Sequence, residues 1–417
     1  MMRVEEALKE VLNPITSLEP TNMAIGDTLN LVLAQTVKAP MDLPRWDNSG
    51  MDGYAVRASD IVGASKNNPK TLPVIGEIAA GSFPGIKLDP KTAIRIMTGA
   101  PIPVGADTIV RFEDTDEEHR QKNQEPLTSI SILKETPNGE AIREQGEDIK
   151  KDDTVFKHGT PINPGIIGVL ASLGLAHTNV VRRPRVAILS TGDEIVQPGK
   201  TLGAGQIFDS NSHSLAALIN NLGAQPEMIG IAKDTVEDLS EKIAAAREYD
   251  LVLTSAGVSL GYYDIVKEVL KQYGDLSLWT VRMRPGKPVA FGMLKGTPDD
   301  PWEKTIPLIG LPGNPVSAMV VFYILARPAI LKMMGYTKWD LPSVEAILED
   351  PIVNFDQRRT YARALVEKKN GIYHARLAGP QGSNILTGMA RANGLAICPE
   401  NTPVLNPGDK AEILLLE

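Results

Sequence analysis

Hydroxyl, glycine and acidic residues gather in three short loops of the chain, at 190–194, 254–261 and 310–315. Each loop follows an apolar run typical of a buried strand. Backbone N–H groups beside glycines, together with hydroxyls, suit the oxygens of an anion such as phosphate. Nearby carboxylates suit Mg²⁺, which takes oxygen ligands and bridges protein to phosphate. The sequence therefore predicts a site for a phosphate ester with a divalent cation.

The candidate residues share a small or polar side chain in or just after these loops. They are Ser190, Thr191, Gly192, Glu194, Gly257, Ser259, Asp264, Gly313, Asn314 and Ser317. The alternative is structural, since each serine could be a turn residue and each acid an N-cap. For Asp234 and Asp264, which stand at predicted helix starts, capping is an equal alternative.

The third loop opens a helix. Asn314 is a favoured N-cap, and Pro315 gives up a donor that the first helical turn leaves unpaired anyway. We expect this corner to turn free N–H groups toward an anion. For one isolated corner, a well-capped structural turn would be the better interpretation. A separate turn places two cations, Arg284 and Lys287, between prolines that fix the backbone, although an ordinary exposed turn would also explain it.

Composition excludes several other classes of protein. A net charge of −8 argues against non-specific nucleic-acid binding, and the single Cys398 excludes an intrachain disulfide and a multi-cysteine zinc site. The amphipathic start is no signal peptide, and no apolar run approaches the roughly 20 residues that span a bilayer. The sequence also lacks GxxxxGK[ST], GxGxxG after a strand and His-x-x-x-His. We expect a cytoplasmic protein without nucleic-acid or membrane partners.

The elements that must position the loops indicate a multidomain α/β plus β protein. Residues 184–335 alternate strands and helices, which predicts a three-layer α/β domain with a mostly parallel sheet and ligands beyond the strands' carboxyl ends. Residues 341–417 read as short strands of a small β-barrel. Residues 1–45 and 147–183 are expected to form a mixed N-terminal linker domain, and 46–146 an inserted β module. The acidic run at 113–118 in that module is expected to be a solvated loop.

Seven motifs along the chain then carry a resemblance. They are Met51-Asp-Gly-Tyr-Ala55, Met97-Thr-Gly-Ala-Pro101, Gly146-Glu-Asp148, Ser190-Thr-Gly-Asp-Glu194, Gly205-Gln-Ile-Phe-Asp209, Arg284-Pro-Gly-Lys-Pro288 and Leu311-Pro-Gly-Asn-Pro-Val-Ser317. In order and content the set resembles the molybdopterin molybdenumtransferase family, the molybdenum insertases related to the insertase half of gephyrin.

The resemblance implies an enzyme that takes adenylylated molybdopterin and molybdate with Mg²⁺. It would cleave the bond between the pterin phosphate and AMP and leave molybdenum on the pterin dithiolene. Glu194, Asp234 and Asp264 match acids of the pterin-nucleotide and metal pocket, and Asp209 lies in a matching motif. The lone cysteine agrees, because the sulfur ligands come from the substrate.

The resemblance also implies a homodimer with a composite active site. Asp52, Thr98 and Asp148 match positions that complete the partner subunit's pocket. Lys287 matches a lysine near the oxyanion.

Three residues of the C-terminal module match groups near molybdate more loosely. They are Arg359 or Arg363, and Ser383. Two departures are Arg284 where lysine is usual, and Ala256 where a second glycine is usual.

Two alternatives remain open. One is the adenylyltransferase that makes the intermediate, whose domain resembles 184–333 but lacks the flanking modules; a transient contact with that enzyme is also expected. The other is a non-catalytic scaffold of the gephyrin kind, although Asp52, Glu194 and Asp264 are all present.

Overall fold

The computed structural model describes residues 1–82, 85–117, 128–255, 274–294 and 305–416. The chain divides into two compact units, here called the main unit and the small unit. The main unit comprises Met1–Gln35, Gly159–Ile167 and Ala176–Glu417, and the small unit comprises Thr36–His158 and Gly168–Leu175. The four-part division predicted from the sequence stays a prediction. The two units differ from it in grouping residues 36–45 and 147–158 with the inserted module.

A six-stranded sheet forms the centre of the main unit. Its strands are, in spatial order, β15 (Gln225–Ala232), β12 (Arg185–Thr191), β16 (Leu251–Ser255), β20 (Ile306–Leu311), β19 (Pro288–Leu294) and β17 (Gly274–Thr280). The first four run parallel, whereas β19 and β17 pair antiparallel. The predicted mostly parallel sheet is confirmed, with an antiparallel edge.

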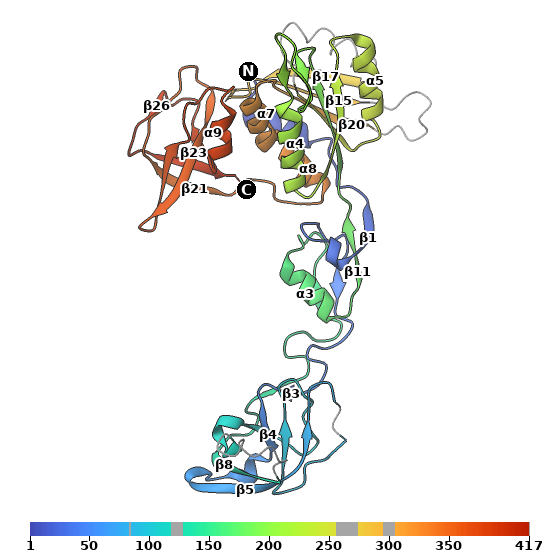
Figure 1. Cartoon of the computed structure of the whole chain (residues 1–417), viewed down its shortest axis with the longest axis vertical. Coiled ribbons are helices and arrows are strands. Elements are labelled where there is room, and N and C mark those ends of the chain that lie inside the picture. Colours follow the sequence, from blue (N-terminus) through green and yellow to red (C-terminus); the bar gives the residue numbers. More distant parts are fainter. Residues whose placement is uncertain (83–84, 118–127, 256–273, 295–304, 417) are drawn as a thin grey trace. The chain divides into compact units, whose positions relative to one another are not determined.

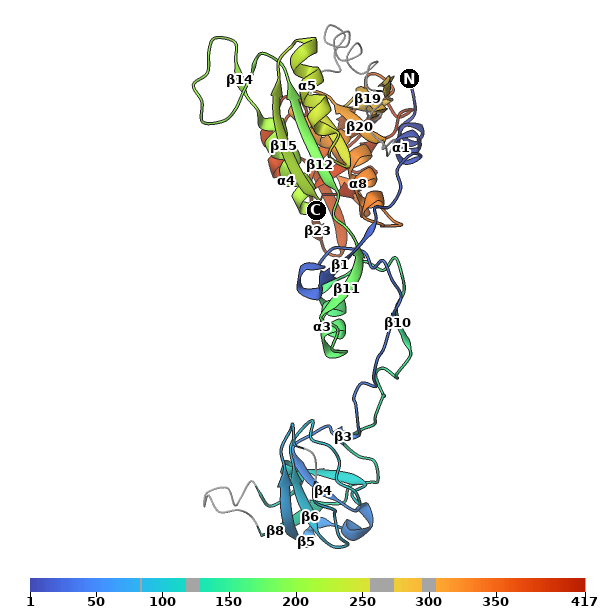
Figure 2. The ribbon, with the colours of Figure 1, turned by 90° about the vertical axis from the view of Figure 1, so that its right-hand side faces the viewer.

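Helices cover both faces of this sheet. Helix α5 (Val236–Ala246) packs Leu239 and Ile243 against Ala187 and Leu189 of β12. Because side chains alternate along a strand, the intervening residues of β12 face the other side, where α4 (Ser210–Asn221) contacts β12 and β15. Figures 1 and 2 show α5 on one face and α4 and α8 on the other, so the predicted three layers are present.

The ends of these helices follow their cap residues. The Asp209 carboxylate accepts the Ser212 N–H at the start of α4, and Gly223 follows its end with φ 83°, a conformation that favours glycine. The Thr235 hydroxyl accepts the Asp238 N–H at the start of α5. Asp234 is therefore not the N-cap of α5, and capping does not explain it.

A continuous helix runs from Pro315 to Met333 through the core. It consists of α7 (Pro315–Val321), a π-helical turn at Phe322–Ala326 and α8 (Arg327–Met333), and α1 (Val4–Leu12) packs against it. The stretch is 19 residues long and apolar enough to span a membrane, so the expectation that no run approaches that length is wrong. Its 18-residue apolar window is 83% buried inside the protein, which makes it a core helix.

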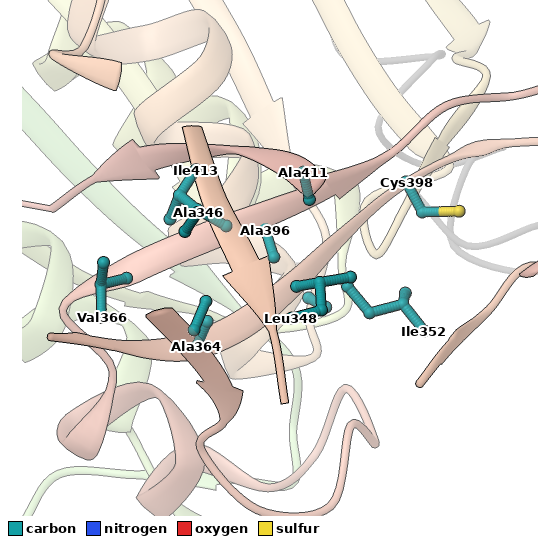
Figure 3. Close-up of a cluster of buried hydrophobic side chains, with 11 residues drawn as sticks. Ala346, Leu348, Ile352, Ala364, Val366, Ala396, Cys398, Ala411 and Ile413 are labelled. Carbon is teal, nitrogen blue, oxygen red and sulfur yellow. The ribbon is translucent and has the colours of Figure 1, made fainter. Parts of the chain in front are cut away.

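The C-terminal strands close into a barrel, as predicted. They are β21 (Ser343–Leu348), β23 (Arg359–Lys369), β24 (Ile372–Leu377), β25 (Gly394–Cys398) and β27 (Lys410–Leu415), and β23 closes the ring by pairing with both β24 and β25. Small side chains fill the interior, among them Ala346, Ala364 and Ala396 (Figure 3). Strand β18 (Met283–Arg284) pairs with the start of β23 and so joins the barrel to the segment before the Arg284–Lys287 turn.

Short elements complete the main unit. They are β1 (Pro20–Ala24), η1 (Ile25–Asp27), β11 (His177–Val181), β13 (Ile195–Val196), β14 (Ile207–Phe208), β22 (Ile352–Val353), α9 (Leu386–Arg391) and β26 (Val404–Leu405). Helix α3 (Pro164–Ser172) has residues in both units. The segment carrying β14 projects away from the sheet (Figure 2).

The small unit is a β module, as predicted. Its main sheet has the order β7 (Thr108–Arg111), β4 (Gly53–Val56), β6 (Ala93–Ile96), β5 (Ser65–Ile78) and β8 (Ser129–Lys134). Short elements around it are β2 (Val37–Lys38), β3 (Asn48–Ser49), η2 (Ala58–Ile61), η3 (Phe112–Asp114), β9 (Ile142–Arg143) and β10 (Thr154–Phe156). A Cβ at Gly53 would lie 2.0 Å from the Val110 oxygen, so only glycine lets β4 and β7 approach.

The acidic run of this module is not a solvated loop at Glu117. That residue is 3% exposed. Its carboxylate accepts the Tyr54 hydroxyl at 2.5 Å and the Arg95 Nη2 at 2.9 Å. The run of acids in the sequence gave no sign that donors from two other strands, Tyr54 and Arg95, would bind Glu117.

Candidate functional site

A cavity of about 710 Å³ opens at the carboxyl ends of the parallel strands, within the size range of small-molecule sites. We call it the strand-end cavity. Seven of the residues predicted from the loops and motifs line it: Ser190, Thr191, Glu194, Asp209, Gly313, Asn314 and Ser317. The loops after β12 and β20 therefore converge, as the parallel sheet predicts.

The floor of this cavity is a buried polar network. The Ser190 hydroxyl donates to the Asp209 carboxylate at 2.8 Å and lies 2.7 Å from the Ser212 hydroxyl. Asp209 thus holds β12 and caps α4, which is a structural task. The neighbouring Thr191 hydroxyl is buried and finds no hydrogen-bond partner among the described residues. A buried orphan hydroxyl costs free energy, so Thr191 is a candidate to contact a ligand.

The helix start at Asn314 differs from the sequence expectation. Asn314 holds the N-cap position, but its side chain makes no capping hydrogen bond. Pro315 has no N–H, and the Val316 N–H donates to the Ser383 oxygen at 3.2 Å. This corner therefore offers fewer free backbone donors than predicted. Because the Asn314 side chain makes no capping bond, it is available to a ligand in the cavity that it lines.

Beside the cavity, three acids repel one another. Burial, followed by the charges of Asp193 and Glu194, raises the pKa of Asp234 to about 6. The Asp234 Oδ1 is buried without a hydrogen-bond partner in the described part of the chain. Gly192, with φ 135°, allows the close packing, because a Cβ there would lie 2.5 Å from the Glu194 Oε2. Carboxylates left in this state attract a cation.

Within the described ranges, no group of three acidic, histidine or cysteine residues is already arranged as a set of metal ligands. Two of the predicted ligands, Glu194 and Asp234, are nevertheless close enough for the charge of one to raise the pKa of the other. The orphaned Asp234 oxygen fits a hard, oxygen-preferring cation. The third predicted ligand, Asp264, lies outside the described residues, as do Gly257, Ser259 and the Ala256 departure.

A second cavity of about 690 Å³ lies where the Arg284–Lys287 turn meets the barrel. We call it the arginine cavity. Arg284, Lys287 and Arg358 supply its cations, and no carboxylate lines it among the residues that the structure describes. Lys287 is exposed and has no ion pair in the same described ranges. The lining is therefore built for an anion.

Glycine 286 keeps the two predicted cations of this turn close to the core. Its φ is 105°, and a Cβ there would lie 2.5 Å from the Val321 Cγ2 of helix α7. The turn therefore packs directly on the helix that follows Asn314. Arg284 and Lys287 line the same cavity as Ser317.

The two arginines predicted on β23 have other surroundings. Arg359 pairs with Glu5 at 2.6 Å and Glu400 at 3.1 Å, and it does not line the cavity. Arg363 is 1% exposed, and burial lowers its pKa.

Arg363 acts on the cavity through a loop. Its guanidinium donates to the Pro380 oxygen at 2.6 Å and the Gly382 oxygen at 3.1 Å, and its Nε has no partner among described residues. Arg363 thus shapes the loop that brings Ser383 into the arginine cavity.

The two cavities meet. Pro288, Asn314, Ser317 and Asn384 line both of them. Ligands in the two cavities would therefore lie side by side, separated by no more than these side chains.

The small unit contains the remaining predicted residues. The Thr98 N–H and hydroxyl both donate to the Asp52 Oδ1 at 2.7 Å. These two bonds, the backbone one first, hold the pKa of Asp52 below its usual range. Asp148 is exposed, and its N–H donates to the Leu43 oxygen at 3.0 Å. The structure thus joins Asp52 to Thr98, and it shows no hydrogen bond from either to Asp148.

Asn211, Asn384 and Arg358 are among the lining residues that were missed from the sequence. Asn211 donates to the Ser255 hydroxyl at 2.7 Å and to the Gly313 oxygen at 2.8 Å, so it links two of the predicted loops. Asn384 lines both cavities, and Arg358 lines the second. Arg358 precedes β23, so the period of two along that strand gave no signal for it.

Comparison with known proteins covers nearly the whole chain. Residues 2–174 match the MoeA N-terminal region (domain I and II), 187–332 a probable molybdopterin binding domain, and 345–416 the MoeA C-terminal region (domain IV). The molybdopterin molybdenumtransferase 2 of Mycobacterium tuberculosis is 36% identical over 420 residues, covering 99% of both chains. The molybdopterin molybdenumtransferase of Nostoc sp. is 37% identical over 389 residues, covering 92% of this chain and 86% of the relative.

A solved structure agrees. The molybdopterin biosynthesis protein of Pyrococcus horikoshii matches with a TM-score of 0.79 and 31% identity, covering 100% of this chain and 99% of that one. The predicted fold class is confirmed by this match. The motifs and the full-length relatives agree, and the chain belongs to the molybdopterin molybdenumtransferase family, transferases of molybdenum cofactor biosynthesis.

Proposed function

We propose that this chain takes adenylylated molybdopterin and molybdate, breaks the pterin phosphate–AMP bond with Mg²⁺, and leaves molybdenum on the pterin dithiolene. The single observation that carries the proposal is the pair of adjoining cavities. A phosphate ester and an oxyanion need separate sets of donors, yet the transfer needs them in contact. Asn314, Ser317 and Asn384 are common walls that meet this requirement.

The strand-end cavity would hold the pterin nucleotide. The orphan Thr191 hydroxyl and the uncapped Asn314 side chain are the donors available to phosphate oxygens. Asn211 links the end of β16 to the loop after β20, so it fixes their spacing before substrate arrives. A rigid arrangement of this kind orients the anhydride at little cost in entropy during the reaction.

Glu194 and Asp234 would hold the Mg²⁺, with Asp264 as the third ligand predicted from the family motif. When bound there, the cation supplies charge stabilisation to the anhydride oxygens as the bond to AMP breaks. The protein's own contribution is the crowding of Glu194 and Asp193 around Asp234, which the cation relieves.

The arginine cavity would hold molybdate. Ser317 and Ser383 offer hydroxyls, and Lys287 a compact cation, to an oxyanion without any competing carboxylate in the described lining. Arg363 would set the position of Ser383 through the Pro380 and Gly382 oxygens. No step requires a protein thiol, and the lone Cys398 is buried in the barrel.

We further propose that the active form is a cytoplasmic homodimer in which Asp52, Thr98 and Asp148 complete the pocket of the partner subunit. Mixing subunits tests this directly. Asp52→Ala and Glu194→Ala variants, each inactive alone, would regain roughly a quarter of wild-type turnover after reassembly, because half of the dimers then carry one intact site. If the mixture stays inactive while both variants still assemble, the shared site is wrong.

The reaction itself is tested by AMP release from adenylylated molybdopterin with molybdate and Mg²⁺. We expect turnover that requires both additions and that Glu194→Ala abolishes. Glu227→Gln is the matched control, since Glu227 is an exposed acid on β15 of the same sheet. A preparation that leaves the substrate intact, or that releases AMP equally well after Glu194→Ala, would refute the proposal. Consumption of ATP with free molybdopterin would instead favour the adenylyltransferase.

A further inference from the structure

A further cavity, of about 850 Å³, lies at the opposite edge of the six-stranded sheet from the strand-end cavity. We call it the amino-end cavity. Its lining includes Arg185 and Gln225, the first residues of β12 and β15, and Asp250, which directly precedes β16. Every lining residue belongs to the main unit, and none of them lines either of the other two cavities. A ligand bound there would therefore occupy a site of its own.

One arginine of this lining has a structural task. The Arg182 Nε donates to the Glu19 Oε1 at 2.6 Å, and its Nη1 and Nη2 donate to the two carboxylate oxygens of Asp250 at 2.6 and 2.7 Å. The Asp250 side chain is only 3% exposed. Each charge of this two-pronged pair is compensated by the other, so stability explains it without a ligand.

Arg183 has a different set of acceptors. Its Nη1 donates to the Gly223 oxygen at 2.5 Å and its Nη2 to the Asp27 oxygen at 3.0 Å. Both acceptors are backbone carbonyls, and no carboxylate pairs with Arg183 in the ranges that the structure describes. A guanidinium has five N–H groups, so these bonds fix its position and leave three donors unused.

Arg185 is held in a similar way. Its Nη1 donates to the Glu248 oxygen at 3.4 Å, and its guanidinium lies 4.6 Å from the centre of the Tyr249 ring. Here too, no ion pair with a carboxylate is present among the residues described. The lining thus carries two guanidinium groups that are positioned by neutral partners and keep their charge for a ligand.

The acids that hold these arginines by their backbone also line the cavity. Asp27 and Glu248 are exposed, and neither carboxylate has a hydrogen bond or an ion pair within the described part of the main unit. When the Arg182–Asp250 pair is set aside, the lining keeps two positive and two negative charges. A lining with both unpaired signs is complementary to a ligand that carries both, and less so to a simple anion.

The rest of the lining is suited to an apolar group. Thr21 and Met23 alternate along β1 and so share one face of it, and Leu29 is 42% exposed. Gly26 lines the same cavity, and a Cβ there would meet no other atom within 4 Å. Open space therefore lies next to an apolar wall.

We propose that the amino-end cavity binds a free α-amino acid with an apolar side chain. The free N–H groups of Arg183 and Arg185 bind its carboxylate, and the carboxylates of Asp27 and Glu248 bind its ammonium group. Its side chain packs on the apolar wall. The inference goes beyond the proposed function, because it assigns a second class of ligand to a site that shares no residue with the two substrate cavities.

The test titrates the full chain with L-leucine in a calorimeter. We expect one leucine to bind per chain. Isocaproate lacks the ammonium group of leucine and isoamylamine lacks its carboxylate, so each should bind at least about tenfold more weakly. The dipeptide leucyl-leucine separates two sources of the same chemistry, because its charged ends lie farther apart. Weaker binding of the dipeptide supports a free amino acid, whereas tighter binding would replace that ligand by a short peptide.

Three variants locate the site. Arg183→Gln and Glu248→Gln each remove one unpaired charge and should raise the Kd for leucine about tenfold. Gly26→Leu keeps every charge and fills the open space, so it should abolish binding. Glu241→Gln is the matched control for Glu248→Gln, because Glu241 is an exposed acid of α5 outside the cavity, and it should leave the Kd unchanged. Thermal unfolding of each variant shows whether the fold is retained.

Three results would overturn the inference. They are a wild-type chain that binds no leucine, isocaproate that binds as tightly as leucine, and an unchanged Kd in a folded Gly26→Leu variant. AMP release should be the same in Gly26→Leu as in the wild type, because the substrate cavities are untouched. The two proposals can therefore fail separately: leucine binding without AMP release contradicts only the proposed reaction, and AMP release without leucine binding contradicts only this site.

Discussion

Glu117 in the small unit is a buried carboxylate and Asp234 in the main unit has one buried carboxylate oxygen, and their surroundings are opposite. Glu117 accepts donors from Tyr54 and Arg95, both from neighbouring strands. Asp234 has a buried oxygen without a partner in the described residues and two further acids beside it. The first arrangement costs little folding free energy, whereas the second costs much. The first is explained by stability, whereas the second is the arrangement that the proposed cation would relieve.

The arginines repeat the contrast. Arg95 is matched by Glu77 and Glu117, so it cross-links strands of the small unit. Buried Arg363 meets only backbone oxygens in the described part of the chain. The uncompensated cation next to the arginine cavity and the uncompensated anions beside the strand-end cavity lie where we propose that the oxyanion and the metal ion bind.

The largest effect is expected from a substitution at Asp234, the carboxylate that lacks hydrogen-bond partners among the described residues. Asp234→Asn removes a charge that the fold tolerates poorly and that the proposed Mg²⁺ site needs. Turnover should fall about 1,000-fold, about 4 kcal/mol of transition-state stabilisation. In Mg²⁺-free buffer at pH 8, the thermal unfolding midpoint should stay the same or rise, because like-charge repulsion is relieved. The increase in that midpoint on adding Mg²⁺ should disappear.

Asp238→Asn is the control for this substitution. Asp238 stands in the first turn of α5, and its carboxylate already accepts the Lys233 N–H at 2.8 Å. The same change of charge at a satisfied acid should leave turnover and the Mg²⁺ response intact. If Asp234→Asn lowers the thermal unfolding midpoint as well as turnover, Asp234 is structural and the contrast with Glu117 is wrong.

The second largest effect is expected from a substitution at Glu117, the carboxylate with two hydrogen-bonding partners. Glu117→Gln leaves Arg95 and Tyr54 without their buried charge partner and should destabilise the small unit by about 3 kcal/mol. Because the chain has two units, hydrogen exchange of amides in β4 and β6 is the suitable measurement. Glu77→Gln, at the 54% exposed partner of Arg95, should cost less than about 1 kcal/mol. Equal protection loss in both variants would contradict the prediction.

The same contrast explains how far the sequence could go. Strands such as Val186–Leu189, the caps at Thr235 and Gly223, and the barrel strands were predictable, because periodicity and cap chemistry are local. The convergence of the 190–194 and 310–315 loops followed from a parallel sheet, a rule of topology.

Side-chain partners brought together by the fold could not be predicted. The burial of Glu117 depends on strands 22 and 63 residues away in sequence. Asn314 has the ideal N-cap identity, but its side chain makes no cap bond. Arg358 was passed over for Arg359 and Arg363, because three arginines within six positions look equivalent until the fold shows that Arg358 lies outside β23 and contacts Asp356.

The smallest expected effect concerns Asp52, an exposed acid. Its hydrogen-bond donors all come from one residue, so its carboxylate is less well compensated than that of Glu117 and better compensated than that of Asp234. Thr98→Val removes one of its two donors, so the pKa of Asp52 should move up toward its usual value of 3.8, measured by NMR titration. Since the pKa of Asp52 is depressed in the folded state, the stabilisation is present at a pH above the unfolded-state pKa and is lost as the pH falls through the folded-state pKa.

The stability difference between wild type and Thr98→Val, below about 1 kcal/mol for an exposed group, should be constant from pH 5 to 8 and shrink below about pH 4. Thr92→Val is the control, because the Thr92 hydroxyl donates to a backbone oxygen, that of Asp89, and the stability difference should not follow this pH dependence. A difference for Thr98→Val that grows in acid would show that Thr98 acts on stability by some route other than the Asp52 carboxylate.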